Sequence, residues 1–180
     1  IGYGDREGAR ALARHNIDLF ERLGVDVIVT DCATCGSTLK EYPELLAEDE
    51  AYAQRAEQFA AQVQDVSEFL ATLPLRKPRR PLEGVRVTYH DPCHLVRGQG
   101  VKAQPRQIIA LSGAELVEMH DADVCCGSAG TKIITDYGTS MALLEKKTAN
   151  VSATGATVVA SGCPGCQMHL GLGAQRAGLD

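Results

Sequence analysis

Tryptophan is absent from this 180-residue sequence, phenylalanine occurs only three times, and positive charge is in the minority. Lys and Arg together number 18 against 23 Asp and Glu residues, which gives a formal net charge of -5 at pH 7. Proteins that bind nucleic acid need clustered positive charge, and those that bind single strands also use aromatic platforms for the bases. We therefore expect a protein partner and no nucleic acid.

Long apolar runs are absent as well. No run approaches the roughly 18 apolar residues of a membrane span, and the start of the chain lacks the basic and apolar regions of a signal peptide. The cysteine count, seven, is odd and does not suit a secreted disulfide framework. We expect no transmembrane segment and a cytoplasmic location, either free or held peripherally at the inner face of the membrane.

Helical and strand patterns alternate along the chain. Apolar spacing predicts helices over 7–23, 37–46, 56–70, 105–111 and 134–151. Short β-branched runs predict strands over 25–30, 85–90, 115–119 and 157–161, the first of them buried on both faces. This alternation predicts an α/β fold with a mainly parallel sheet flanked by helices, whose ligand sites lie beyond the C-terminal ends of the strands.

Three prolines and four basic residues lie between Pro74 and Pro81, where neither a helix nor an inner strand would tolerate them. We predict a linker over 74–81 that joins a first unit, 1–73, to a second unit, 82–180. The basic charge would also suit acidic lipid or an acidic partner, but a solvated connector is the simpler interpretation.

An internal repeat relates the two units. A shift of 131 positions aligns helix, glycine, strand and Cys-x-x-Cys, and the matched pairs include Gly24 with Gly155, Thr30 with Ser161, Cys32 with Cys163, and Cys35 with Cys166. A chance resemblance of two helix–strand–turn units is the alternative, but it accounts poorly for a Cys-x-x-Cys in register. The shift places the partners of Cys125 and Cys126 ahead of residue 1. Because the chain also lacks an initial Met, we expect a truncated first unit in the C-terminal part of a longer protein.

Five cysteines follow the three predicted strands of the second unit: Cys93, Cys125, Cys126, Cys163 and Cys166. Thiolates are the usual protein ligands of iron–sulfur clusters, and loops at one sheet edge bring sulfurs together. Five sulfurs exceed a tetrahedral zinc shell, and an adjacent Cys-Cys pair suits a cluster that offers more than one iron, with Gly127 relieving the turn.

Two other interpretations of these residues stay open. A zinc site would use some of the thiolates with His90 or His94 nearby, and a thiol–disulfide redox site would use Cys163 and Cys166. His94 follows Cys93 directly and is placed either to donate a hydrogen bond to a cluster sulfur or to serve as an ordinary loop histidine.

Three motifs, "HDPCH" at 90–94, "CCGSAG" at 125–130 and "GCPGC" at 162–166, resemble the CCG, or cysteine-rich, domain. The segment "DCATCGSTLKEYP" at 31–43 resembles the end of another copy. The domain occurs in the iron–sulfur subunit of glycolate oxidase, in lactate-utilisation iron–sulfur proteins and in the heterodisulfide reductases. In that family two copies follow a ferredoxin-like segment, which this sequence does not contain.

The resemblance implies a [4Fe-4S] cluster, which is noncubane in the heterodisulfide reductases. Its implied ligands are Cys93, Cys125, Cys126, Cys163 and Cys166, with Cys32 and Cys35 as the remnant of a second site. The implied function is electron transfer from a flavoprotein subunit, which oxidises a 2-hydroxy acid such as glycolate or lactate, toward quinone or another acceptor. A disulfide-cleaving catalytic subunit and a zinc-stabilised interaction module are the alternatives, and no catalytic residues are assigned.

Overall fold

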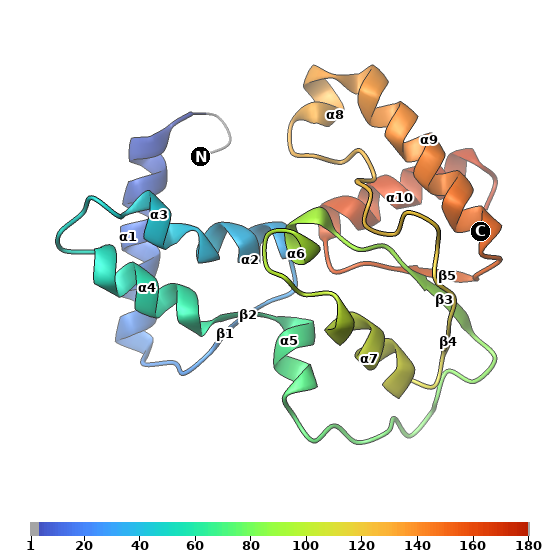
Figure 1. Cartoon of the computed structure of the whole chain (residues 1–180), viewed down its shortest axis with the longest axis horizontal. Helices are drawn as coiled ribbons and strands as arrows, with labels where there is room; N and C mark the ends of the chain where they lie inside the picture. Colours follow the sequence, from blue (N-terminus) through green and yellow to red (C-terminus); the bar gives the residue numbers. More distant parts are fainter. Residues whose placement is uncertain (1–3, 180) are drawn as a thin grey trace.

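The computed structural model describes residues 4–179, and its first half is mainly helical (Figure 1). The two strands of this half pair in parallel, with Ile28 opposite Val63. In chain order the elements are α1 (Arg6–Leu23), β1 (Ile28–Thr30), α2 (Ala33–Lys40), α3 (Tyr42–Leu45), α4 (Ala53–Gln62), β2 (Val63–Asp65) and α5 (Val66–Ala71).

The second half contains a parallel sheet of order β4-β3-β5, so the chain crosses over β3 between β4 and β5. Its elements are β3 (Arg86–Tyr89), α6 (Cys93–Val96), α7 (Ala103–Leu111), β4 (Glu115–Leu116), α8 (Lys132–Thr135), α9 (Tyr137–Ala153), β5 (Val158–Ala160) and α10 (Pro164–Arg176). The predicted α/β fold with parallel strands flanked by helices is confirmed, although the strands form two small sheets.

Helix α1 shows how local sequence sets an element. The Asp5 carboxylate accepts a hydrogen bond from the Gly8 N–H at 2.9 Å and caps the first turn, and Gly24 ends the helix with φ 60°. Ala13 and Ile17 lie on the inner face with no exposed surface and pack into a core that includes Phe59. This apolar core belongs entirely to the first half of the chain.

Two of the predicted elements in the first half are wrong in extent. The helix predicted over 56–70 is interrupted by β2, because the Asp65 carboxylate caps α5 and Glu68 closes a capping box with it. The helix predicted over 37–46 instead starts at Ala33 and ends at Lys40, and α3 follows as a separate turn.

The strand predicted to be buried on both faces is also corrected. In β1 the Ile28 side chain is 5% exposed but the Val29 side chain is 42% exposed. A strand in a two-stranded sheet has little packed against one of its faces, so its β-branched composition overstates its burial.

The two Cys-x-x-Cys turns have matching backbone geometry. Cys32 has φ -130° and ψ 108° and directly precedes α2, while Cys163 has φ -143° and ψ 115° and directly precedes α10. Gly24 and Gly155, which the repeat also pairs, both have φ 60°. This local agreement extends the sequence repeat to the conformation of the strand-to-helix turn.

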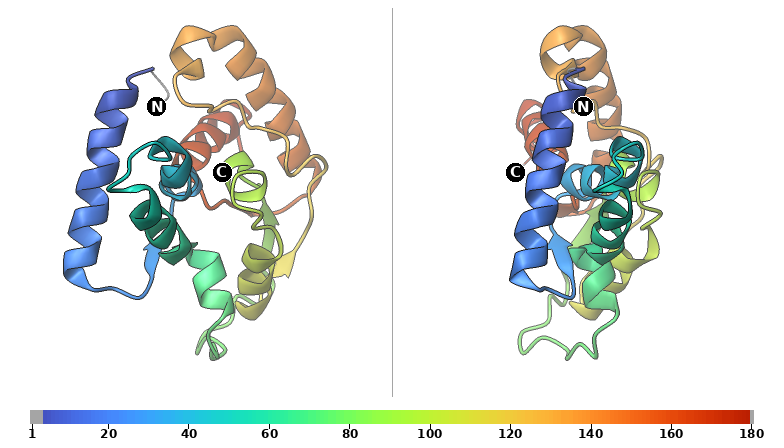
Figure 2. Two further views of the ribbon diagram at one scale, coloured as in Figure 1. Left: turned by 60° about the vertical axis from the view of Figure 1, so that its left-hand side comes forward. Right: turned by 90° about the vertical axis from the view of Figure 1, so that its left-hand side faces the viewer.

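The two halves contact each other through the first of these turns. Helix α2 packs against α6 and α5 against α7, as the views in Figure 2 show. The Ala33 N–H donates to the Gly162 carbonyl at 2.9 Å, and Gln99 donates to the Ala33 carbonyl at 2.9 Å. The Cys-x-x-Cys turn of the first half therefore lies against the corresponding turn of the second.

Residues 74–81, all of them described, form neither helix nor strand and are largely exposed. Among the helices of residues 4–179, none combines the length and the apolar character that a membrane span requires.

Candidate metal centre

The five predicted ligand cysteines lie in the segments that follow the parallel strands β3, β4 and β5. Cys93 begins α6, just after β3. Cys125 and Cys126 lie in the connection between β4 and α8, and Cys163 directly precedes α10, with Cys166 in the first turn of that helix. Because parallel strands end on one side of a sheet, all three loops open onto that side.

Neighbouring thiols in this group shift each other's pKa. The Cys125 thiol raises the pKa of Cys93, and the Cys126 thiol lowers the pKa of Cys125. The Cys126 thiol raises the pKa of Cys166, and the Cys166 thiol lowers the pKa of Cys163. The sulfurs thus form one series in the order Cys93, Cys125, Cys126, Cys166, Cys163. Cys125 and Cys163 ionise most readily, and thiolate is the form that binds metal.

One side of the thiol series is apolar and the other is open. Cys126 has no exposed surface, and it packs in a cluster that also contains Leu95, Val101 and Leu170. Cys93 and Cys125 are only half-buried. A group held by these thiols would therefore be shielded from water at Cys126 and reachable by a partner near Cys93.

The loop that carries the Cys-Cys pair is fixed at Gly127. This glycine has φ 95°, a conformation that side chains rarely adopt, as predicted for the turn after the pair. Its N–H donates to Cys125 Sγ at 3.3 Å, and Ser140 donates to its carbonyl at 2.8 Å. Ser128 donates to the Gly165 carbonyl at 2.9 Å and ties this loop to the Cys163 turn.

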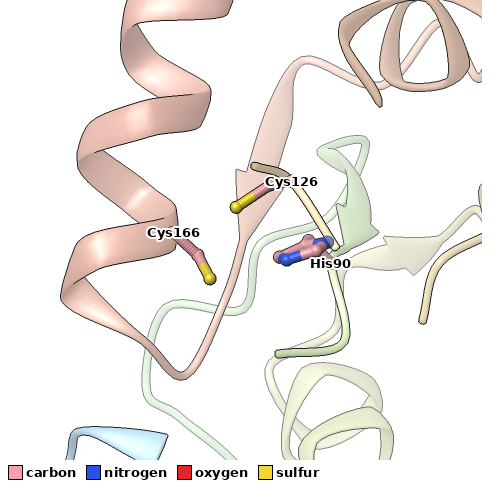
Figure 3. Close-up of side chains that lie close together, drawn as sticks. All are labelled: His90, Cys126 and Cys166. Atoms are coloured by element: carbon pink, nitrogen blue, oxygen red, sulfur yellow. The ribbon is translucent and has the colours of Figure 1, made fainter. Parts of the chain in front are cut away.

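His90 joins the thiols from the end of β3. Its ring is fully buried, and one of its nitrogens lies within 4.8 Å of both Cys126 Sγ and Cys166 Sγ, which face the same space in Figure 3. Burial, aided by the nearby charge of Lys147, lowers the pKa of His90 to about 4. Within the part of the chain that the structure describes, neither Nδ1 nor Nε2 has a hydrogen-bond partner. From the sequence, His90 was considered only as a residue near the thiolates of an alternative zinc site.

An ion pair fixes the turn that carries His90 and Cys93. The Asp91 carboxylate is 1% exposed and accepts two hydrogen bonds from the Arg106 guanidinium, at 2.8 Å and 2.9 Å. Arg106 also binds Glu118 at 2.6 Å. This pair was not predicted, because Asp91 and Arg106 are separated by a loop and a helix and share no sequence motif.

Cys32 and Cys35 lie beside the site formed by the five cysteines. Cys32 Sγ accepts a hydrogen bond from the Cys35 N–H at 3.4 Å, and the Cys32 thiol raises the pKa of Cys35, with a smaller contribution from Cys163. Thr34 Oγ1 lies 3.7 Å from Cys163 Sγ. Sequence reasoning treated the two sites as separate, because nothing in the repeat shows that the units meet at these turns.

His94 lies at the exposed end of the series, with Nδ1 3.5 Å from Cys93 Sγ. The whole donor set fits an iron–sulfur group better than a single zinc ion. It offers five thiols in series, more than one tetrahedral ion accepts, and a buried imidazole with no hydrogen-bond partner among the described residues.

Comparison with known proteins gives a family match. The family model described as "Cysteine-rich domain" (CCG) matches residues 1–40 and 87–171, together more than half of the chain. The "Probable glycolate oxidase iron-sulfur subunit" of Bacillus subtilis is 39% identical over 179 residues, which cover 98% of this chain and 40% of that protein.

Two further relatives carry different names. A fumarate reductase (CoM/CoB) subunit of Methanothermobacter marburgensis is 39% identical over 158 residues, covering 87% of this chain and 30% of that protein. The "Lactate utilization protein A" of Halalkalibacterium halodurans is 28% identical over 176 residues, covering 97% of this chain and 71% of that protein. The chain thus spans less than half the length of the first two of these three relatives.

Proposed function

Because this chain belongs to the cysteine-rich (CCG) domain family, we propose that its five thiols hold an iron–sulfur cluster that serves electron transfer. The proposed ligands are Cys93, Cys125, Cys126, Cys163 and Cys166. The observation that carries the proposal is the convergence of the cysteine-bearing segments at one edge of the sheet, where Cys126 Sγ, Cys166 Sγ and a nitrogen of His90 lie within 4.8 Å of one another. Relatives named as iron–sulfur proteins support the identity of the group.

A [4Fe-4S] cluster bound here would accept and release single electrons. The protein's part is to hold it and to set its surroundings. Thiolates at Cys125 and Cys163 supply negative charge, the Gly127 N–H already donates to Cys125 Sγ, and Leu95 with Leu170 keeps water from the Cys126 side. The half-buried thiols Cys93 and Cys125 leave a short route to a docked partner.

The proposed partners follow from the named relatives. In a glycolate oxidase or lactate-utilisation complex, a flavoprotein subunit would oxidise the 2-hydroxy acid, and this chain would pass the electrons toward quinone or another acceptor. The flavin would do the substrate chemistry. We propose a cytoplasmic complex, free or peripherally held at the inner face of the membrane.

A second candidate is reductive cleavage of a disulfide at the cluster. It follows from the resemblance of the cysteine motifs to the heterodisulfide reductases, and it is favoured by the exposure of Cys35 beside Cys163. Two successive one-electron reductions of the cluster by an external donor, with two protons from solvent, would convert one disulfide into two thiols.

Anaerobic purification followed by iron, acid-labile sulfide and zinc analysis tests the proposal. We expect iron and sulfide in similar amounts, and a paramagnetic signal that changes on reduction. Zinc without sulfide, bound even when the protein is made anaerobically with iron supplied, would instead favour a zinc site at His90, Cys126 and Cys166. Turnover of a mixed disulfide by the reduced protein, with no flavoprotein present, would favour the second candidate.

A further inference from the structure

We propose that His90 donates an N–H hydrogen bond to a sulfur of the bound cluster and thereby raises the cluster's reduction potential. The inference rests on the proposed function, because it assigns a positioning residue to the same site. It goes beyond the cysteine ligands, since His90 would act on the cluster through hydrogen bonding to sulfur.

The backbone holds His90 at a fixed place. Its N–H donates to the Ala160 carbonyl at 2.9 Å, which continues the pairing of β3 with β5 beyond Tyr89. The next residue, Asp91, is held by Arg106. The imidazole therefore leaves the sheet edge in one direction, and Figure 3 shows it facing Cys126 and Cys166.

The ring has no hydrogen-bond partner among residues 4–179. Both nitrogens are buried, and a buried polar group left unpaired destabilises the folded state. The Ala122 carbonyl lies near the ring, but it accepts from the Asp91 N–H at 3.1 Å and from Lys147 at 3.4 Å, and it has no hydrogen-bond geometry with His90. Buried polar groups in folded proteins are almost always paired, so the missing partner is expected in the bound group.

The chemistry of the site favours donation over ligation. A neutral imidazole carries one N–H donor and one lone pair. The five thiols already supply the ligands that the iron of the cluster needs, so an iron–nitrogen bond to His90 is not required. The thiolate and sulfide sulfurs are electron-rich hydrogen-bond acceptors. Reduction adds negative charge to the cluster, so an N–H donor stabilises the reduced form more than the oxidised form and raises the potential.

The direct test uses the full chain with its histidines labelled with ¹⁵N, loaded with cluster and reduced. We expect a weak ¹⁵N coupling in pulsed EPR that is lost in His90→Phe and kept in His120→Phe, whose imidazole is 82% exposed. A strong coupling typical of direct iron–nitrogen bonding, or no coupling lost with His90, would overturn the proposal. Because His94 Nδ1 lies 3.5 Å from Cys93 Sγ and would also couple, the loss must occur in His90→Phe and not in His94→Phe, and His90→Gln replaces His90→Phe if that variant does not fold.

Redox titration gives an independent readout. We expect a more negative midpoint potential in His90→Phe and a return toward the wild-type value in His90→Gln, which keeps an N–H donor. Thr88→Val is the matched control, because it removes another buried, unpaired polar atom from β3. Equal potentials in His90→Phe and wild type would overturn this inference alone. An absence of iron and sulfide in the wild-type protein would overturn the proposed function as well.

Discussion

Replacing Cys126 by serine should remove the cluster while leaving most of the fold in place. Cys126 is central to the thiol series, because its thiol shifts the pKa of both Cys125 and Cys166. Serine keeps the size of the side chain but exchanges a soft sulfur for a hard oxygen, which binds iron in a cluster poorly. The expected result is a large loss of bound iron.

The cost to the protein without cluster can be estimated from burial. The new hydroxyl would lie in the apolar cluster of Leu95, Val101 and Leu170 with no exposed surface. An unpaired buried hydroxyl costs roughly 1–3 kcal/mol of unfolding free energy. Leu95→Ala, in the same cluster, should cost about 2–5 kcal/mol because it opens a cavity.

These two variants separate ligand loss from instability. Each is reconstituted anaerobically, its iron and sulfide are measured, and its urea unfolding is followed with and without the cluster. Leu95→Ala should bind iron and be stabilised by it, although it is the less stable protein. Cys126→Ser should bind little iron and gain no stability on reconstitution, since cluster binding and folding are coupled. Wild-type iron content in Cys126→Ser, or equal iron loss in both variants, would refute Cys126 as a ligand.

Two further substitutions, each paired with a control, test by urea unfolding how the loops around the site are held in place. Arg106→Met leaves the Asp91 carboxylate buried and unpaired and should lower the free energy of unfolding by about 3–5 kcal/mol. Glu118→Gln, at a half-exposed carboxylate, should lower it by under about 1 kcal/mol. Similar losses of unfolding free energy in the two variants would contradict the role of the buried pair. Gly127→Ala should cost at least about 1–3 kcal/mol through its positive φ and should also lower iron content. Gly138→Ala, in open space on α9, should be neutral or stabilising by up to about 1 kcal/mol, and equal effects of the two would be against this view of the turn.

The elements that depend only on local sequence signals could be predicted from the sequence. The glycines at 24 and 155, the β-branched runs and the loops that follow them are local features, so the strands of the second half and the cysteine-bearing loops are found near their predicted places. Strand β2 was missed because Val63 and Val66 fit a helical spacing as well as a strand, and only the Asp65 cap separates the two.

The arrangement of the site depended on contacts that sequence spacing does not encode. His90 is buried beside Cys126 and Cys166, which come from much later in the chain than β3. The approach of Cys32 and Cys35 to Cys163 follows from the packing of α2 on α6. Motifs identified the residue types of the candidate centre, whereas these tertiary contacts determine which of them are neighbours.

The hydrogen bond from Ala33 to Gly162 joins the two Cys-x-x-Cys turns directly and bypasses the linker. The covalent connection at 74–81 should therefore be dispensable once the chain has folded. Trypsin has two exposed sites to cleave there, after Arg76 and after Arg79, since Lys77 and Arg80 each precede a proline. We expect the two fragments to co-elute in size-exclusion chromatography under native conditions and to separate only in denaturant. Fragments that part without denaturant would show that the contact between the turns is too weak to hold the units together. If they stay together, the noncovalent contacts between the halves, which include α2 with α6 and α5 with α7, are sufficient to hold Cys35 close to Cys163 without the linker.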